Sequence, residues 1–403
     1  MSPRRTRNDT EKQQYALAAA YLASLGDTQT EIGEKLEIKQ PEVSRLLRLA
    51  EGRKWLTYRD PAFDPKGVEE LWEAAQAKFA KFLSPKGLLE KLQRLQPGGV
   101  PRLRSVTVIR HQQGTFHPSV TEAIKAVLHR AAVVGVTWGR TMYDALQIFE
   151  KTLQQPIRVA NPIQFVPLCG EPMMDVLDPL HYSSSALVAV LHEKVNGKAP
   201  GDTNPPPPSL GGVPIIIPAG YTSEEVQVIR HYIGQVSGYG IVFGKGGPGG
   251  PRRKPGAGAK PGLVEQVDTV LTSLGVAKKE HRGIFLQQRV DLGDISEREL
   301  TATVVGDIGG VIIPTGGELS PAAARKLEEM GERWTGVKLH HLERCAGDAV
   351  KGGKPGVVVF SRGGPCPQER ATVVRRAIEL GLVNELVCDG ELADALGGGT
   401  ATA

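Results

Sequence analysis

The sequence predicts an α/β protein in two parts, a helix-turn-helix domain of winged-helix type followed by a Rossmann-like parallel α/β domain. Two observations carry this prediction. Residues 11–58 show three short helical patterns and then a strand-like tail, KWLTYR. From about residue 104, apolar β-branched runs such as SVTVIR and VVVFS alternate with helical patterns. That alternation is typical of a parallel sheet covered by helices on both faces.

Composition narrows the class of protein. The 403 residues suffice for two or three domains with a sizeable core. The net charge of +5 permits a polyanionic partner without requiring one. The four cysteines form no CxxC pair, which argues against a disulfide framework and a structural zinc site. No apolar run reaches the roughly 18 residues of a membrane span, and the start, MSPRRTRNDTEKQQ, lacks the apolar segment of a secretory signal. We therefore expect a cytoplasmic protein with no membrane partner.

The first part, residues 1–60, contains the spacing of a helix-turn-helix. Thr28 and Glu31 have the spacing of a capping box at the start of one helix, and Pro41 suits the first turn of the next. Gly33 is the small residue expected where the two helices cross. The apolar residues that would lock the helices together are Ile32, Leu36, Ile38, Val43, Leu46 and Leu47. Glu37 departs from the pattern, since glycine usually stands at this turn.

The outward face of the second helix predicts binding to double-stranded operator DNA. The side chains left for DNA are Gln40, Glu42, Ser44, Arg45 and Arg48. Arg45 suits a guanine edge or a phosphate, and Ser44 suits a phosphate. Arg4 and Arg5 in the N-terminal arm would add phosphate contacts. A three-helix unit used for protein contacts is the alternative.

Residues 61–100 are predicted to be linking helices. The stretch VEELWEAAQAKFAKFL places apolar side chains on one broad helical face: Val68, Leu71, Trp72, Ala75, Phe79 and Phe82. We expect this face to couple the domains and to pair subunits in a homodimer or homotetramer.

Residues 101–403 are predicted to form the α/β domain, interrupted by Gly/Pro-rich loops at 197–212 and 244–262. Within it, VVGVTWGRTMYDAL combines the end of a strand, a turn at Gly139 and the start of a helix. Free backbone N–H groups at a helix start favour an anion, and Arg140 and Thr141 would add donors. Taken alone, the turn is explained equally well as a plain strand-to-helix connection.

The order of motifs resembles the SorC family of bacterial transcriptional regulators, which are similar in plan to DeoR-type repressors. The motifs are QTEIGEKLEIKQPEVSRLL, GVTWGRTM, DTVLTSLG, GDIGG and ERATVVRRAIELGLVNELVCDGELADAL. The resemblance implies a C-terminal domain of sugar-isomerase type that binds a small phosphorylated sugar as effector. It places Gly139, Arg140 and Thr141 in the phosphate-gripping turn and Ser273 at a strand end. Asp307 would accept hydrogen bonds from sugar hydroxyls.

One loop departs from the family pattern. Where the family has a lysine shortly after a GG pair, this chain reads RGGPCPQER, so Arg370 takes the helix-start position in a longer loop. Arginine can still hold a phosphate. This departure keeps a ligand-independent DNA-binding regulator open as an alternative to the effector-controlled one.

An enzyme related to sugar-phosphate isomerases or deaminases is the other alternative. The fused helix-turn-helix argues against it. So does the lack of a convincing acid–base pair, since Asp294 with Glu297, and Asp389 with Glu391, are better explained as helix-start charges. We expect no catalytic residue and no cofactor. His340, His341 and Cys345 share a predicted helix and could form a metal-binding pair, but no carboxylate or further ligand is evident nearby except Glu343, and no metal site is expected.

Overall fold

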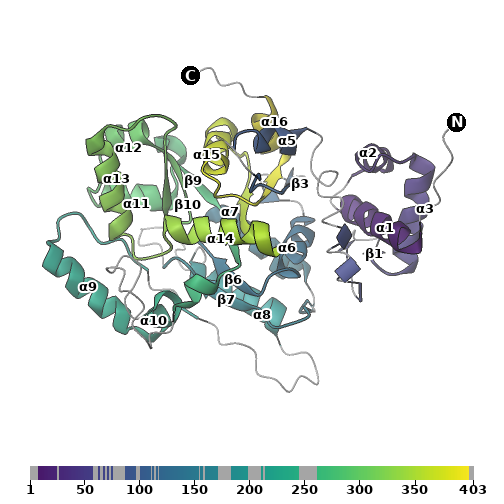
Figure 1. The fold of residues 1–403 in the computed structure, drawn as a ribbon, viewed down its shortest axis with the longest axis horizontal. Helices are drawn as coiled ribbons and strands as arrows, with labels where there is room; N and C mark the ends of the chain where they lie inside the picture. The colour runs from purple at the N-terminus through teal and green to yellow at the C-terminus, as the bar shows by residue number, and fades with distance from the viewer. Residues whose placement is uncertain are drawn as a thin grey trace.

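The N-terminal part is a winged helix-turn-helix. In the computed structural model, α1 (Asp9–Ser24), α2 (Gln29–Lys35) and α3 (Gln40–Gly52) precede a hairpin of β1 (Leu56–Thr57) and β2 (Ala62–Phe63) (Figure 1). The predicted strand in KWLTYR is therefore present as β1. Its partner β2 lies in the range that the sequence assigns to linking helices, where α5 (Leu88–Gln93) follows.

The structure describes most of the chain. The described residues are 8–24, 27–57, 62–63, 67–68, 70–71, 74–75, 87–96, 100–109, 111–112, 115–116, 118–153, 155–157, 159–170, 183–197, 210–211, 214–244 and 261–398. Several residues singled out above lie outside these ranges: Arg4, Arg5, Trp72, Phe79, Phe82 and most of the loops 197–212 and 244–262. None of the described helices is long and apolar enough to cross a membrane.

A six-stranded parallel sheet forms the centre of the second part, as predicted. Its order is β3-β13-β12-β8-β6-β7, and every neighbouring pair runs parallel. The strands are β3 (Ser105–Ile109), β6 (Val133–Val136), β7 (Gln164–Pro167), β8 (Thr269–Thr272), β12 (Gly356–Ser361) and β13 (Glu385–Asp389). A short hairpin of β4 (His111–Gln112) and β5 (Thr115–Phe116) follows β3.

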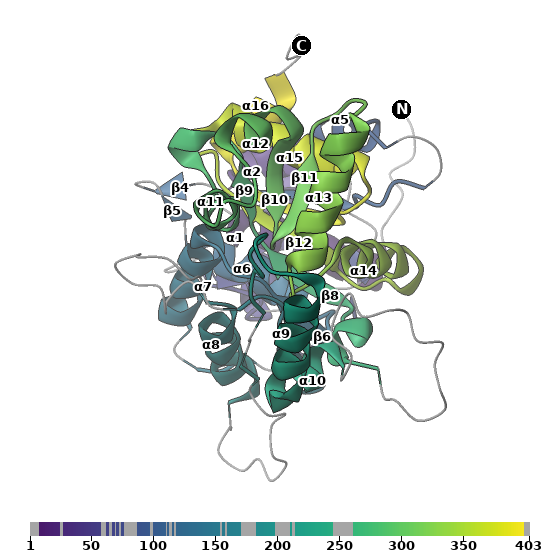
Figure 2. The same ribbon diagram turned by 90° about the vertical axis from the view of Figure 1, so that its left-hand side faces the viewer.

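Helices cover both faces of this sheet (Figures 1 and 2). In β12, Val358 and Phe360 join one hydrophobic cluster, while Val357 and Val359 join the other. The first cluster includes residues of α6 (Val120–Leu128), α7 (Arg140–Thr152) and α8 (Ser184–Asn196). The second includes residues of α14 (Leu339–Gly352), α15 (Pro367–Glu379) and α16 (Gly390–Gly398). Burial of both faces explains why the strands are unbroken apolar runs.

A second, antiparallel sheet is inserted between β8 and β12, and the sequence pattern did not predict it. Its order is β11-β10-β9. The inserted elements are β9 (Leu274–Val276), α11 (Ile284–Asp291), α12 (Glu297–Thr303), β10 (Val304–Ile308), β11 (Val311–Pro314) and α13 (Pro321–Arg333). The remaining helices α9 (Ser223–Gln235) and α10 (Ser237–Phe243) protrude at one end (Figure 2).

Asp294 corrects one expectation. It is completely buried and paired with the equally buried Arg289 at 2.6 Å. Ser296 and Glu299 form the capping box of α12 instead, and Glu297 supplies negative charge in the first turn. Asp294 is thus part of a buried ion pair and not a helix-start charge, because Arg289 could be enclosed only with a counter-charge.

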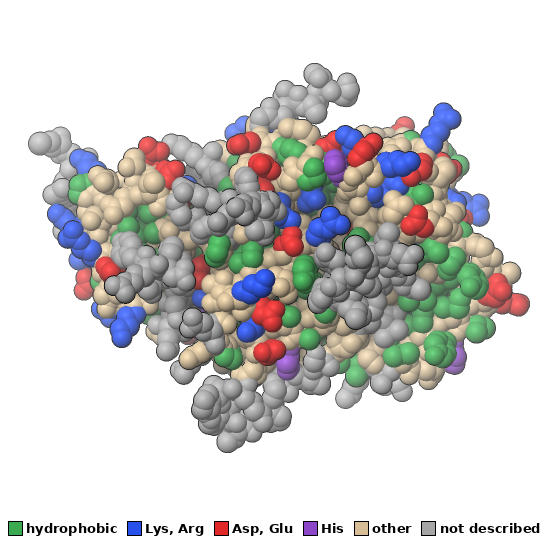
Figure 3. Space-filling view, turned by 180° about the vertical axis from the view of Figure 1, so that it is seen from behind, with side chains coloured by type: hydrophobic (Ala, Val, Ile, Leu, Met, Phe, Trp, Pro, Cys, Tyr) green, Lys and Arg blue, Asp and Glu red, His purple; other side chains and the backbone are tan. Residues whose placement is uncertain are grey.

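Exposed apolar side chains lie on and beside α9 and α10. Val228 and Tyr232 in α9, Tyr221 before it and Ile241 in α10 are all at least 46% exposed. Hydrophobic side chains also gather at this end of the molecule in Figure 3.

Candidate DNA-binding and anion-binding sites

The helix-turn-helix has the local interactions that its sequence predicts. Thr28 and Glu31 form a complete capping box: Thr28 N–H donates to the Glu31 carboxylate at 2.7 Å, and Glu31 N–H donates to Thr28 Oγ1 at 3.3 Å. A Cβ on Gly33 would lie 2.9 Å from the carbonyl oxygen of Ile38. Only glycine therefore allows α2 to approach the turn so closely.

The second helix presents part of its predicted face to solvent. Gln40, Arg45 and Arg48 are exposed, whereas Glu42 and Ser44 are half-buried. The opposite face is fixed to α1 and α2 by buried residues, among them Val43 and Leu47. The exposed face is thus free to enter a groove of DNA, as a recognition helix must.

A cleft of about 640 Å³ lies at the carboxyl end of the parallel sheet, against the inserted part. Its lining comes from residues that follow β6, β8 and β12, from the end of β13, and from the segment between β9 and α11. The carboxyl end of the strands is where open α/β sheets bind ligands. The cleft brings together all six predicted effector residues: Gly139, Arg140, Thr141, Ser273, Asp307 and Arg370.

Gly139 shapes the floor of this cleft. Its φ is 138°, in the region that favours glycine. A Cβ there would lie 2.1 Å from Ser273 Oγ. The glycine therefore allows the first turn of α7 to sit directly beside the end of β8, with Arg140 as the first helical residue.

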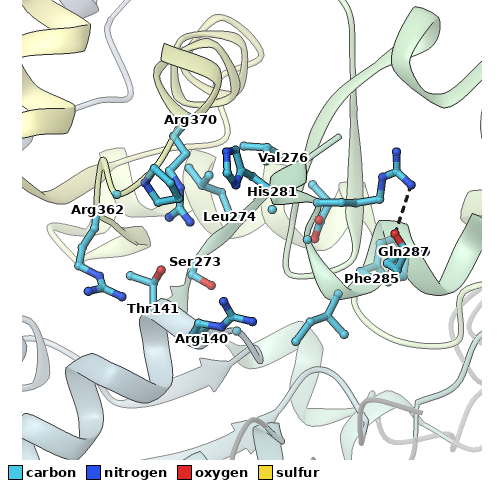
Figure 4. A pocket seen from close by; sticks show the side chains of 18 of the residues that line it. Arg140, Thr141, Ser273, Leu274, Val276, His281, Phe285, Gln287, Arg362 and Arg370 are labelled. Carbon is cyan, nitrogen blue, oxygen red and sulfur yellow. Dashed lines mark hydrogen bonds between the residues drawn. The ribbon is translucent and has the colours of Figure 1, made fainter. Parts of the chain in front are cut away.

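Two of the arginines in the cleft are paired. Arg282 binds Glu297 through both guanidinium nitrogens, at 2.9 and 2.5 Å, and also contacts Gln287 at 3.2 Å (Figure 4). Arg362 binds Asp144 at 2.5 Å and lies over the Phe116 ring. These pairs hold the walls of the cleft together.

Arg140 and Arg370 differ from that paired set. Among the described residues, neither side chain forms a hydrogen bond or an ion pair, and Arg370 Nε is buried without any partner. Arg140 is exposed at the start of α7. Figure 4 shows the two side chains arriving from different elements, with Ser273 between them. Arg140 is attracted to Asp144, whose carboxylate is already bound by Arg362. Two arginines without a hydrogen-bonded partner in one cleft suit an anion.

Asp307 is the buried acid of the site. It is 4% exposed, and its Oδ2 accepts a hydrogen bond from Gly310 N–H at 3.0 Å. Burial raises the pKa of this carboxyl to about 6, an effect that the Gly310 hydrogen bond partly opposes. At neutral pH the carboxylate can accept hydrogen bonds from hydroxyl groups in the cleft.

Sequence reasoning missed several residues that line the cleft: Lys279, His281, Arg282, Arg362 and Asp389. Arg362 and Asp389 carried a usable signal, since each lies at the end of an apolar strand pattern. The others belong to the inserted part, whose position over the sheet is set by tertiary packing.

Glu265, His340 and His341 place their potential ligand atoms within 4.8 Å of one another. The hydrogen bonds argue against a metal there. His341 Nδ1 accepts from Lys338 N–H at 3.0 Å, so Nε2 must carry the proton that faces Glu265 at 3.3 Å. A metal ligand needs a free lone pair, and the imidazole in this tautomer has none left. Glu265, the neighbour of the histidine pair, is distant in sequence and was not anticipated.

Comparison with known proteins agrees with this architecture. The chain is 32% identical over 143 residues to the deoxyribonucleoside regulator of Bacillus subtilis, a match that covers 34% of this chain and 40% of that relative. The full-length sorbitol operon regulator SorC of Klebsiella pneumoniae has the same fold, with a TM-score of 0.50 and 16% identity over 96% of this chain and 98% of SorC. The chain therefore shares the fold of SorC, and its sequence match to the Bacillus subtilis regulator spans less than half of that relative's length. No family model matches the chain.

Both of these similar proteins are described as regulators. The loop RGGPCPQER brings Arg362 and Arg370 to the cleft.

Proposed function

We propose that the protein is a cytoplasmic, DNA-binding transcriptional regulator whose cleft binds a small phosphorylated sugar. The observation that carries the proposal is the pair of arginines without hydrogen-bonded partners, Arg140 and Arg370, in a cleft on the same chain as a winged helix-turn-helix. We assign the ligand the role of a signal, because the similar proteins are regulators.

The phosphate group would lie at the start of α7. There the N–H groups of the first helical turn are free, the helix dipole favours negative charge, and Arg140 and Thr141 add donors. Arg370 would bind the same phosphate from α15. Asp307 and Ser273 would then meet the sugar hydroxyls, which fits the buried acceptor character of Asp307.

The name of the Bacillus subtilis relative suggests which sugars to test first. We propose 2-deoxyribose 5-phosphate as the first probe, with glucose 6-phosphate and inorganic phosphate for comparison. A ligand at 100 times its Kd stabilises a protein by about 2.7 kcal/mol. We therefore expect at least one sugar phosphate to raise the melting temperature of the full chain measurably.

Arginine variants localise this effect. Arg140→Ala and Arg370→Ala should each abolish the rise in melting temperature. Arg325→Ala is the matched control, since Arg325 is an exposed arginine on α13 far from the cleft lining. If no probe stabilises the wild-type chain, or if both variants respond like the wild type, the effector part of the proposal is wrong.

The operator part needs its own test. We propose that α3 enters the major groove with Gln40, Arg45 and Arg48 facing DNA, and that Glu42 and Ser44 are placed at its margin. Arg4 and Arg5 would reach phosphates, and two or four subunits would bind together. Arg45→Ala should weaken binding to DNA upstream of the protein's own gene by 1–3 kcal/mol, roughly 5- to 150-fold. Equal affinity of wild type, Arg45→Ala and Arg325→Ala would contradict this role of α3.

A further inference from the structure

The second half of helix α1 is buried on every side. Residues 16–22 are each no more than 4% exposed, and seven successive residues cover nearly two full turns of a helix. The stretch ALAAAYLA is apolar all round, which is stable only where the helix is enclosed. One side of α1 packs against α3 in the helix-turn-helix. Helix α2 and the hairpin of β1 and β2 also contact α1.

The α/β domain supplies part of this cover. The side chain of Tyr21 in α1 hydrogen-bonds that of Thr107 in β3. One continuous hydrophobic cluster joins α1, α2 and α3 to Ile109 of β3 and to Val120 and Val127 of α6. The DNA-binding domain is thus packed against the first strand and first long helix of the α/β domain (Figure 1).

A second cavity, of about 740 Å³, lies at this junction and is lined by both domains. Tyr21 comes from α1, while Thr107, Arg130 and Glu385 come from the α/β domain. Glu385 binds Arg130 through both carboxylate oxygens, at 2.7 and 3.0 Å. Arg130 follows the end of α6, so this ion pair ties α6 to the first residue of β13.

Strand β13 runs from one cavity to the other. Glu385 and Val387 line the junction cavity, and Asp389, the last residue of the strand, lines the effector cleft. Asp389 Oδ1 accepts hydrogen bonds from Gly363 N–H and Leu392 N–H, both at 2.9 Å. Four residue steps of a strand span about 13 Å. Strand β13 is paired with β3 on one side and with β12 on the other.

We propose that α1 is a docking helix, held on β3 by Tyr21 and Thr107, and that β13 couples this contact to the effector cleft between Glu385 and Asp389. The coupling rests on the proposed function of the cleft. The docking contact does not. A ligand that displaces the Asp389 end of β13 would change how firmly α1 is held, and with it the position of the DNA-binding domain.

The docking contact is tested without ligand, by amide hydrogen exchange of peptides covering residues 16–24 in the full chain. Tyr21→Phe removes the hydroxyl and keeps the ring, and exchange in α1 should rise roughly fivefold, as expected for one lost buried hydrogen bond. Thr107→Val should have the same effect, the double variant should show no further rise, and Thr107→Ser should restore protection.

Tyr239→Phe is the matched control. Tyr239 is equally buried, and its hydroxyl donates to the carbonyl of Thr335 at 2.8 Å, within the α/β domain. This variant should leave exchange in α1 unchanged. Wild-type exchange rates in both Tyr21→Phe and Thr107→Val, or the same rise in Tyr239→Phe, would overturn the docking contact.

The coupling is tested with inorganic phosphate, which probes the arginine pair whatever sugar the protein recognises. Phosphate that raises the melting temperature should also change exchange in α1 by about fivefold or more. Glu385 and Arg130 lie outside the cleft. In Glu385→Gln and in Arg130→Lys, phosphate should therefore still raise the melting temperature but should no longer change hydrogen exchange in α1.

Each result of the coupling test has a distinct meaning. If phosphate raises the wild-type melting temperature and α1 exchange does not change, the coupling is wrong and the anion site stands. If both variants transmit the change as the wild type does, β13 is not the route. If phosphate has no effect on the melting temperature, the anion site and the coupling fail together, and the docking test still decides the role of α1.

Discussion

Glu37 occupies the turn of the helix-turn-helix with a φ of 53°. This left-handed conformation costs a residue with a Cβ roughly 1 kcal/mol, whereas glycine adopts it freely. We therefore expect Glu37→Gly to stabilise the domain by somewhat less than about 1 kcal/mol, because glycine also gains freedom in the unfolded chain. Denaturant unfolding measures the difference. A destabilised variant would show that the Glu37 side chain makes a stabilising contact.

Asp307 should make stability depend on pH. Its pKa is about 6 in the fold and near 3.8 when unfolded, so between these values the folded protein binds more protons and stability falls as pH rises. The stabilising effect of protonated Asp307 on the free energy of unfolding is complete below pH 3.8 and lost above about pH 6. Asp307→Asn removes the buried charge that lowers stability at high pH. The free energy of unfolding of the variant should therefore exceed that of the wild type by on the order of 1–3 kcal/mol at pH 7.5 and by much less at pH 4.5.

Urea unfolding at the two pH values measures this gain. Asp348→Asn, at a side chain 65% exposed on α14, is the control and should show no such difference. A gain for Asp307→Asn that is equal at both pH values would contradict the role of burial. The same substitution should weaken binding of a sugar phosphate, because the charged acceptor is lost.

Individual site residues could be predicted from the sequence where they belong to one local sequence motif. Gly139, Arg140 and Thr141 share one turn, and that turn does lie at the cleft. Arg282 and Arg362 were not predictable as paired residues, since their partners Glu297 and Asp144 come from other elements. The sequence shows a charge, but the fold decides whether that charge is compensated.

Two helices of the molecule begin with the same capping box and allow a matched test at the scale of elements. Thr28 caps α2 and Thr222 caps α9, each with a glutamate three residues later. Alanine at either position should cost about 1 kcal/mol of helix stability. Only Thr28→Ala should weaken DNA binding, because α2 supports the recognition helix. Equal DNA affinities of the two variants would contradict that assignment.

The parallel strands were predictable as elements because they are buried on both faces and read as apolar runs. The antiparallel sheet was not predicted, and its strand β9, with only three residues, is too short to show a strand pattern. One signal was available. Gly309 and Gly310 have φ of 57° and 84° between β10 and β11, and a two-residue glycine loop between apolar runs is typical of a hairpin.

At the scale of the whole molecule, the order of domains was predictable and their contact was not. The sequence assigned coupling to the linking residues 61–100, and that remains a prediction because many of them lie outside the described residues. The structure encloses the second half of α1, whose apolar sequence on all sides was a sign of burial that helical periodicity alone could not locate. Packing between domains depends on residues far apart in sequence, such as Tyr21 and Thr107.

The central claim is that an anion in the cleft controls binding to DNA. The most direct test is fluorescence anisotropy of labelled DNA from upstream of the protein's gene, titrated with the full chain in the presence and absence of 2-deoxyribose 5-phosphate, glucose 6-phosphate or inorganic phosphate. The account predicts that at least one probe changes the Kd fivefold or more, that Arg140→Ala binds DNA normally without responding, and that Arg325→Ala responds like the wild type. Specific DNA binding that no probe alters, or an Arg140→Ala variant that responds fully, would contradict it.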